Sequence, residues 1–146
     1  MQRQSGFTLI ELITVIVVLG ILAAFAIPRF AGLETQARVA TVNGMAGAVK
    51  SGAALAHALY IVDGSNPVTV TMEGQAVAIV NGYPSDAVAG IVKTLQDTTG
   101  FTSAANSNGW LLSFTNAPTA ATCSVEYIEP AALNTPPTYT VLTAGC

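Results

Sequence analysis

The sequence has few ionisable side chains and few candidates for catalytic or metal chemistry. Only 9% of its 146 residues are charged, against about 25% in soluble domains. Five Lys and Arg face eight Asp and Glu, so there is no basic surplus for binding phosphates. One histidine, His57, and two cysteines, Cys123 and Cys146, fall short of the usual zinc ligand sets. A hydrolase triad would have to be built on His57. Composition therefore disfavours an enzyme, a zinc protein and a nucleic-acid-binding protein.

What the sequence does have is a long apolar run near its N-terminus. Residues 7–27 read FTLIELITVIVVLGILAAFAI, with Glu11 as the one charge. At about 1.5 Å per residue, a helix over this run spans roughly 30 Å, the thickness of a bilayer core. Only a helix pairs the backbone groups locally in lipid, despite the many β-branched residues. The run therefore predicts a transmembrane helix.

A secretory signal peptide is the competing interpretation of this run. The apolar run is longer than that of a signal peptide. The run also continues into Pro28-Arg29-Phe30 rather than into a small-x-small cleavage site. The short head, MQRQSG, contributes Arg3 and the free amine as cations, opposed by Arg29 beyond the run. The positive-inside rule then favours a cytoplasmic N-terminus.

Glu11 is the anomaly of the apolar run. An acidic side chain within a membrane helix costs about 2.5–3.5 kcal/mol on insertion scales and is normally paired or functional. Glu11 stands only four positions after Phe7, so its carboxylate could reach the headgroups by snorkelling. Snorkelling does not explain why a carboxylate stands where any apolar residue would cost less. A partner cation is the better explanation.

The order Gly6-Phe7-Thr8-Leu9-Ile10-Glu11, after a short leader containing Arg3 and before an apolar run ending at Pro28, resembles the type IV prepilin signature. The resemblance implies cleavage after Gly6 by a prepilin peptidase and methylation of the new Phe7 amine. It also implies that Glu11 pairs with the Phe7 amine of a neighbouring subunit when the helices bundle into a filament core. That amine supplies the missing cation in a low-dielectric setting, where a charge pair matters most.

The resemblance extends to a class and a branch. The short leader and Phe7 look like class a of the type IV pilins. The segments PRFAGLETQAR (28–38) and NGYPSDAVAGIVKTL (81–95) are similar to the mannose-sensitive haemagglutinin pilin branch. We expect four divisions: a cleaved leader (1–6), a transmembrane and filament-core helix (7–28), an amphipathic second half of the stem helix (29–62) and a globular α+β head (63–146).

Pro28 falls inside what is otherwise one long helical pattern. It deletes one backbone hydrogen bond and clashes with the preceding turn, so it predicts a kink. In pilins the stretch between a Gly such as Gly20 and such a Pro can lose helicity on assembly, and we expect 20–28 to be the extensible part. An ordinary proline kink is the alternative.

The helical pattern resumes after Pro28 and continues to about Val62. It contains a row of small residues at four-residue spacing, which packs either in a filament or on the chain's own sheet, and we favour the sheet for most of the row. Beside the row runs an apolar face that can lie on a sheet. The row is Ala40, Gly44, Ala48, Gly52 and Ala56, and the apolar face is Val39, Val42, Val49, Ala53 and Leu59.

The remaining residues predict a small antiparallel head. The turn-forming run 63–67 ends the helix. The segments 68–72 and 75–80 flank Glu73-Gly74 as a β-hairpin. Asn81-Gly-Tyr-Pro84 then breaks the second strand, and a short helix follows over about 86–96, capped by Ser85. Three strand-like runs complete an antiparallel meander: 110–115, 123–128 and 138–143. This order of elements favours an α+β fold, as in pilins.

Cys123 and Cys146 lie beyond the apolar run, and outside the cytosol their default state is a disulfide. It would close a loop of about 24 residues and stabilise the fold by roughly 3 kcal/mol on the chain-entropy model. Two buried thiols are the alternative. In pilins this pairing bounds a variable surface loop, so 124–145 is the expected surface for outside contacts.

Other side chains fit structural roles better than binding roles. We interpret His57, Tyr83 and Trp110 as packing residues rather than ligand-binding ones. Beyond Ser51 the one cation is Lys93, against six acids, which disfavours direct nucleic acid binding by the head. The run 63–66 resembles part of a calcium loop but lacks the later acidic ligand. We therefore expect no metal and no cofactor.

The sequence thus predicts a structural subunit of a type IV pilus used for attachment or motility. It would be held in the inner membrane before assembly and then polymerise with identical subunits into an extracellular filament. Its other partners would be the prepilin peptidase and the pilus assembly machinery. Two alternatives stay open: a pseudopilin of a type II secretion system, and a single-span membrane-anchored module that does not polymerise. An enzyme is the weakest reading, since no nucleophile–base pair or phosphate loop is visible in the sequence.

Overall fold

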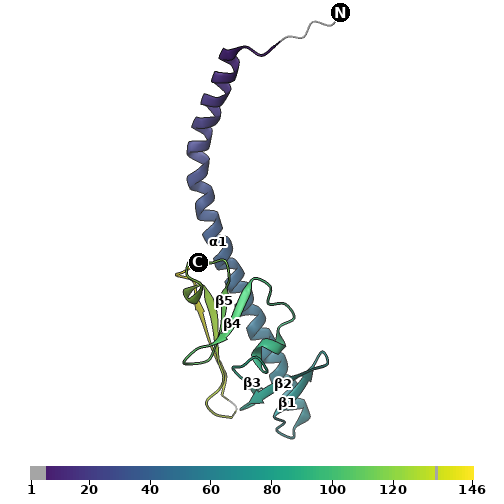
Figure 1. The fold of residues 1–146 in the computed structure, drawn as a ribbon. Coiled ribbons are helices and arrows are strands. Elements are labelled where there is room, and N and C mark those ends of the chain that lie inside the picture. The colour runs from purple at the N-terminus through teal and green to yellow at the C-terminus, as the bar shows by residue number, and fades with distance from the viewer. Residues whose placement is uncertain (1–5, 134) are drawn as a thin grey trace, which may run out of the picture. The chain divides into compact units, whose positions relative to one another are not determined.

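The computed structural model describes residues 6–133 and 135–146, and Figure 1 shows how their elements are arranged. The predicted leader falls almost entirely on residues 1–5, which lie outside the described residues. The chain divides into two compact units, Met1–Gln36 and Ala37–Cys146. One helix, α1 (Leu9–Asp63), contributes its first part to one unit and its second part to the other.

Helix α1 continues through Pro28 without interruption. It ends where the turn-forming run was predicted to end it, because Gly64 has a positive φ of 68° and its amide donates to the Tyr60 carbonyl at 3.3 Å. A left-handed glycine directly after the last helical residue is the common way to terminate a helix. The Asp63 carboxylate accepts hydrogen bonds from the amide and hydroxyl of Ser65.

The four-residue row of small side chains does not lie on the sheet as a whole, so that prediction was wrong for most of it. Ala40, Gly44 and Ala48 are exposed, and only Gly52 and Ala56 are buried. A helix turns about 100° per residue, so a strict four-residue row rotates about 40° at each step and winds around the helix. The predicted apolar face is confirmed: Val42, Val49 and Ala53 are fully buried, and Val39 and Leu59 are partly buried.

The predicted hairpin is confirmed. Strands β1 (Thr69–Met72) and β2 (Gln75–Val80) pair antiparallel. Glu73 and Gly74 connect them with φ of 50° and 80°, the backbone that two-residue hairpin turns require. The segment 81–84 does not simply end the second strand, because β3 (Tyr83–Pro84) turns back and pairs with the end of β2. The sheet order is β1-β2-β3.

The predicted helix over 86–96 was wrong, since the only helical turn there is the 3₁₀ helix η1 (Ile91–Thr94). Backbone groups of this segment form hydrogen bonds with partners outside a helical pattern. The Ala89 carbonyl accepts from the Ala78 amide of β2 at 2.8 Å, and the Ser85 carbonyl accepts from the Ile91 amide at 2.9 Å. These bonds to the strand and across the turn replace the hydrogen bonds that a helix would need.

The second sheet has four strands, one more than the three predicted. Its antiparallel order is β4-β5-β6-β7, which confirms the meander, and a short 3₁₀ helix, η2 (Ala120–Thr122), precedes β6. The strands are β4 (Phe101–Ala105), β5 (Trp110–Phe114), β6 (Ser124–Ile128) and β7 (Thr138–Leu142). The missed strand, β4, reads FTSAA, and four of its five residues are exposed, so it lacks the apolar alternation that reveals a half-buried strand.

The residues from Ala37 onward form two apolar clusters. In one, α1 residues such as Val42 and Val49 pack on β5 and β6 through Leu112, Val125 and Tyr127. In the other, Ala56 and Tyr60 of α1 pack with residues of β1 and β2. The buried Tyr127 hydroxyl joins the two sheets by donating to the Pro84 carbonyl at 2.6 Å. These contacts confirm an α+β layout in which the helix packs against antiparallel sheets (Figure 1).

Candidate functional site

The N-terminal part of α1 exposes a long surface that is mostly apolar. Exposed fractions run from 74% at Leu9 and 76% at Phe25 to 43% at Ile13. Among the described residues, α1 is the one helix long and apolar enough to cross a membrane, and none of its most apolar 18-residue window is buried. Soluble surfaces rarely carry a contiguous apolar patch of this kind. The segment therefore needs lipid or other protein around it.

Thr8 and Glu11 start this helix with a reciprocal set of hydrogen bonds. The Thr8 amide and hydroxyl both donate to Glu11 Oε2, at 2.8 and 2.7 Å. In return the Glu11 amide donates to the Thr8 hydroxyl oxygen at 3.3 Å. Since α1 begins at Leu9, Thr8 is the N-cap and Glu11 the third helical residue. This is a capping box, which satisfies two backbone donors that the helix start leaves free.

Thr8 is a helix-capping partner of Glu11 that the sequence-based predictions missed, although its signal was present. A Thr followed three residues later by a Glu, ahead of an apolar run, is the sequence pattern of a capping box. The box gives Glu11 a local role within its own chain, besides the partner cation inferred above. Both Thr8 donors reach Oε2, so Oε1 can accept from an amine of another chain.

The other predicted residues of this segment lie along one stretch of chain. Gly6 and Phe7 precede α1, and the Phe7 side chain is 85% exposed. Gly20 and Pro28 both stand inside α1, with helical residues between them. A Cβ added to Gly20 would have nothing within 4 Å. The predicted cleavage point between Gly6 and Phe7 is thus outside regular secondary structure.

The predicted pairing of the two cysteines is confirmed. Cys123 and Cys146 form a disulfide, and both are buried in the cluster with Trp110 and Leu112. The Arg38 guanidinium of α1 donates to the Cys146 carbonyl at 2.8 Å. The tail is therefore attached both to the start of β6 and to the helix, a double attachment that limits fraying.

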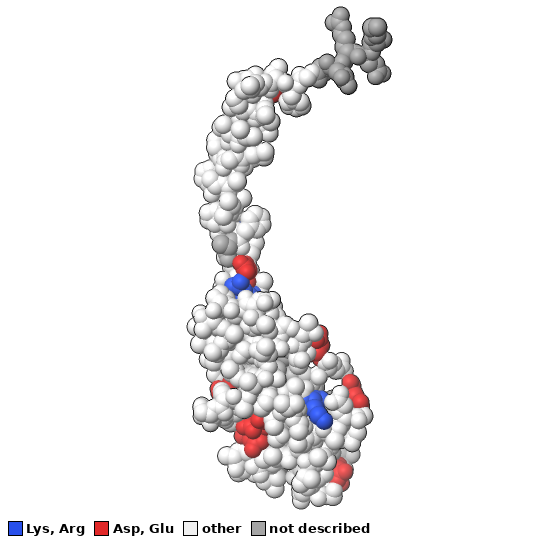
Figure 2. All heavy atoms as spheres, viewed as in Figure 1, with Lys and Arg blue, Asp and Glu red and all other residues white. Residues whose placement is uncertain are grey.

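His57 and Tyr83 pack as the sequence suggested. Their rings stack with centroids 4.0 Å apart and planes 4° from parallel, and His57 Nδ1 lies 2.8 Å from the Gly82 carbonyl oxygen. Trp110 is buried in the larger cluster. Over the described residues, no group of three or more His, Cys, Asp or Glu side chains could hold a metal ion. Figure 2 shows more acidic than basic surface on the face in view.

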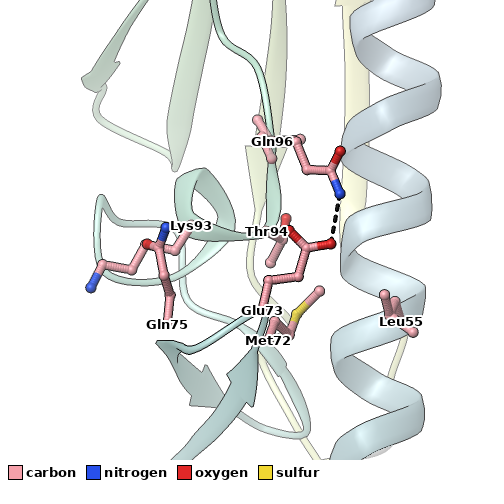
Figure 3. Close-up of a pocket in the computed structure, with 8 residues that line it drawn as sticks. Leu55, Met72, Glu73, Gln75, Lys93, Thr94 and Gln96 are labelled. Carbon is pink, nitrogen blue, oxygen red and sulfur yellow. Dashed lines mark hydrogen bonds between the residues drawn. The ribbon is translucent and has the colours of Figure 1, made fainter.

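An open surface pocket lies between α1, the β1–β2 turn and η1 (Figure 3). Leu55 and Met72 give it an apolar side, and the Gln96 amide donates to Glu73 Oε1 at 2.6 Å. Lys93 also lines it, pointing away from the Glu73–Gln96 pair in Figure 3. Its polar groups do not converge on one point as those of an enzyme site do.

Comparison with known proteins gives the N-terminal segment its clearest relationship. Residues 1–27 match the family described as the prokaryotic N-terminal methylation motif. The chain is similar to the type IV narrow pilus major component PilA5 of Thermus thermophilus, with 56% identity over 55 residues, 38% of this chain and 47% of the relative. It is similar to the type IV major alpha-pilin of Moraxella bovis, with 41% identity over 68 residues, 47% of this chain and 40% of the relative.

A third relative belongs to a different apparatus. The type II secretion system core protein G of Pseudomonas aeruginosa is 49% identical over 43 residues, 30% of this chain and 30% of the relative. The matches to all three relatives span less than half of each relative's length. No solved structure matches the chain. The relatives named here are pilus and secretion-system components by name, none of them an enzyme.

Proposed function

We propose that this chain is the structural subunit of a type IV pilus, polymerising through the N-terminal part of α1 into a surface filament for attachment or motility. The observation that carries the proposal is the methylation-motif match over residues 1–27, which coincides with an apolar helical segment that is not buried among the residues the structure describes. Similarity to two named pilus components supports the same function. A packed α+β unit follows the segment and would form the filament's outer part.

The proposed pathway begins in the inner membrane, which holds the subunit by its apolar segment. A prepilin peptidase cleaves after Gly6, the Phe7 amine is methylated, and the assembly machinery extracts the subunit into an extracellular pilus. Extraction from lipid is offset by burying the same apolar surface against neighbouring helices. The Glu11 carboxylate, through Oε1, pairs with the Phe7 amine of a neighbour and sets the register of the bundle.

The divisions inferred from the sequence belong to this proposal: a leader (1–6), a filament-core helix (7–28), the rest of the stem (29–62) and the head (63–146). Within the core helix, we assign 20–28 as the extensible part. Gly20 and Pro28 are each poor helix formers, by about 1 and 3 kcal/mol relative to Ala. The segment is helical in the single chain, so unwinding would accompany assembly.

Within the pilins, we infer membership of the mannose-sensitive haemagglutinin branch of class a. The support is the sequence similarity in 28–38 and 81–95. The second segment contains the β2–β3 turn and η1, whose shape depends on bonds to β2 and Ser85. An experimental structure from that branch with a regular helix over these residues would contradict the assignment.

A pseudopilin of a type II secretion system is the second candidate, favoured by the similarity to core protein G. The disulfide between Cys123 and Cys146 argues against it, because the major pseudopilins typically carry a calcium site instead. A head that loses stability on chelation of calcium, and not on reduction, would support the pseudopilin.

The test of the proposed function is intact-mass and N-terminal peptide spectrometry on protein sheared from the cell surface. The expected chain begins at N-methylated Phe7 and lacks two hydrogens at the disulfide. Processed protein found only in the cell envelope would favour the pseudopilin. Membrane protein that keeps Met1 would favour the non-polymerising anchor and contradict the pilus.

A further inference from the structure

Within the part of the chain that the structure describes, the four-stranded sheet has two unpaired edges that match each other. Its order places β4 and β7 at the ends, and each strand is antiparallel to the next. With four antiparallel strands, the two edge strands run in opposite directions. A second copy of the chain in the same orientation can therefore lay its β4 antiparallel to the β7 of the first.

The ladder between β4 and β5 fixes which backbone groups of β4 face outward. In an antiparallel strand, the backbone N–H and C=O groups of every second residue bond to one neighbouring strand. The backbone groups of the residues between them point to the opposite side of the strand. The Thr115 amide donates to the Gly100 carbonyl at 2.9 Å, so the even-numbered residues of β4 bond to β5. Ser103 and Ala105 then direct their N–H and C=O groups to the open edge, and both residues are exposed.

The ladders of β6 with β5 and β7 fix in the same way which backbone groups of β7 face outward. The Phe114 amide donates to the Cys123 carbonyl at 2.9 Å, so the odd-numbered residues of β6 bond to β5 and the even-numbered ones to β7. The register joins even-numbered residues of β6 to even-numbered residues of β7. Tyr139 and Val141 therefore direct their backbone groups outward. The two edges offer the same spacing of donors and acceptors.

Neither edge strand carries the features that usually keep sheet edges apart. Such edges are protected by charged residues, proline or bulges, and the strand sequences FTSAA and TYTVL contain no charge and no proline. The residues whose backbone groups face outward also have their side chains on the same face of the sheet. Ser103 pairs with the buried Leu112, and Val141 pairs with the buried Val125. Joining the edges would continue that face from copy to copy.

We propose that neighbouring copies join their four-stranded sheets, with β7 of one copy antiparallel to β4 of the next, Ser103 opposite Val141 and Ala105 opposite Tyr139. A head-to-tail contact joins different surfaces of the two copies, and it builds an open filament when the rotation between copies does not close a ring. The inference rests on the proposed function, because β4 could otherwise pair with the β4 of a second copy about a two-fold axis. A filament whose subunits all point one way has no such axis between neighbours.

A cysteine pair tests this register. Ala104 and Thr140 would face each other in a non-hydrogen-bonded pair, with Cα atoms about 4.5 Å apart and within reach of a disulfide. Inside one copy they stand three strand spacings apart, roughly 14 Å, which is too far. Mild oxidation of filaments carrying both Ala104→Cys and Thr140→Cys should give a ladder of covalent multimers on a non-reducing gel.

The single variants provide matched controls. Ala104→Cys alone and Thr140→Cys alone should stay monomeric, and filaments that mix the two should give dimers and nothing larger. Dimers from Ala104→Cys alone would show two-fold pairing and overturn the proposal. Filaments of the double variant without a ladder would overturn it as well. In both cases filaments exist, so the proposed function stands; a wild-type chain that forms no filaments contradicts that function instead.

A proline substitution covers the case in which the cysteine variants do not assemble. Ser103→Pro removes an outward N–H and breaks no bond to β5, whereas Ser103→Ala keeps that N–H. We expect Ser103→Pro to unfold at the wild-type temperature as a monomer yet to yield about tenfold fewer filaments. Ser103→Ala should assemble normally. Normal filament yield from Ser103→Pro would overturn the pairing.

Discussion

In the Thr8–Glu11 capping box, the Glu11 carboxylate has two properties, its hydrogen-bond acceptors and its charge. Its hydrogen-bond acceptors close the first turn of α1 through Oε2, and its charge is available to a cation of another chain. A glutamine at this position can accept the same hydrogen bonds but carries no charge. The local role and the proposed assembly role of Glu11 can therefore be tested independently.

Glu11→Gln should impair assembly about as strongly as Glu11→Ala, because both remove the charge that pairs with the Phe7 amine. Thr8→Ala keeps that charge and weakens the cap by about 1 kcal/mol, so its filament yield should stay near wild type. The measurement is sheared filament yield relative to membrane-inserted subunit. Normal filaments from Glu11→Gln would show that capping, and not charge, is what Glu11 contributes.

Burial, together with the nearby Tyr83, raises the pKa of Tyr139 to about 12. A phenol that ionises near 10 in the unfolded chain and near 12 in the folded chain contributes stability below pH 10 and loses it as the pH rises toward 12. We expect the free energy of unfolding of the full chain to fall across this window. Tyr139→Phe should fall less steeply and should lose a step near pH 12 in ultraviolet absorbance.

Wild-type protein in which every tyrosine titrates near 10 would contradict this assignment. Burial raises the pKa of Tyr127 as well, and further than that of Tyr139, so Tyr127 ionises only above the window of Tyr139. The Tyr127 hydroxyl also donates to the Pro84 carbonyl, so Tyr127→Phe removes a buried hydrogen bond as well as a titrating group. Tyr139→Phe is the cleaner variant.

Among the elements, those with a strong apolar period could be predicted from the sequence. The long helix, the β1–β2 hairpin and strands β5 to β7 have that period, and the structure contains all of them. The segment 86–96 has a helical period too, but its backbone bonds to β2 and Ser85 instead. Strand β4 has no apolar period, and its place at the sheet edge is set by pairing with β5. Such long-range pairings are invisible in local sequence.

Some features of the candidate site could likewise be predicted from the sequence, and others could not. The apolar segment, Glu11 and the cysteine pair could be read from residue types, and the capping box was present as a Thr and a Glu three residues apart. The matching edges of the four-stranded sheet could not be read, because they depend on strand order and on the phase of the ladder.

Two glycines of α1 provide a matched test of its packing. A Cβ on Gly52 would lie 3.1 Å from the Thr94 carbonyl oxygen, whereas a Cβ on Gly44 would have nothing within 4 Å. Gly44→Ala should raise the free energy of unfolding by up to about 1 kcal/mol, because alanine is the better helix former. Gly52→Ala should lower the thermal midpoint. Equal effects of the two substitutions would contradict the contact between α1 and η1.

For the whole chain, the unit Ala37–Cys146 depends on its tail. The disulfide attaches Cys146 to the start of β6, and Arg38 attaches the same residue to α1. Charged side chains are few, so ion pairs contribute little to holding the fold. Apolar packing and the disulfide carry its stability.

Loss of the disulfide should therefore cost about 3 kcal/mol. Cys123→Ser with Cys146→Ser should show a lower denaturation midpoint and no further change on adding reductant. A serine residue at the buried Cys123 position adds an unpaired hydroxyl, so Cys123→Ala with Cys146→Ala is the control for that effect. Reduction of the wild-type protein without any loss of stability would contradict this prediction.

For the whole molecule, we propose that this chain builds a filament whose core is the apolar segment of α1. A helical reconstruction by electron cryomicroscopy of filaments sheared from the cell surface tests it most directly. We predict subunits beginning at Phe7, with residues 7–28 bundled at the axis and each Glu11 beside the Phe7 amine of a neighbour. Filaments built from another chain, or a reconstruction with this segment outside the core, would contradict it.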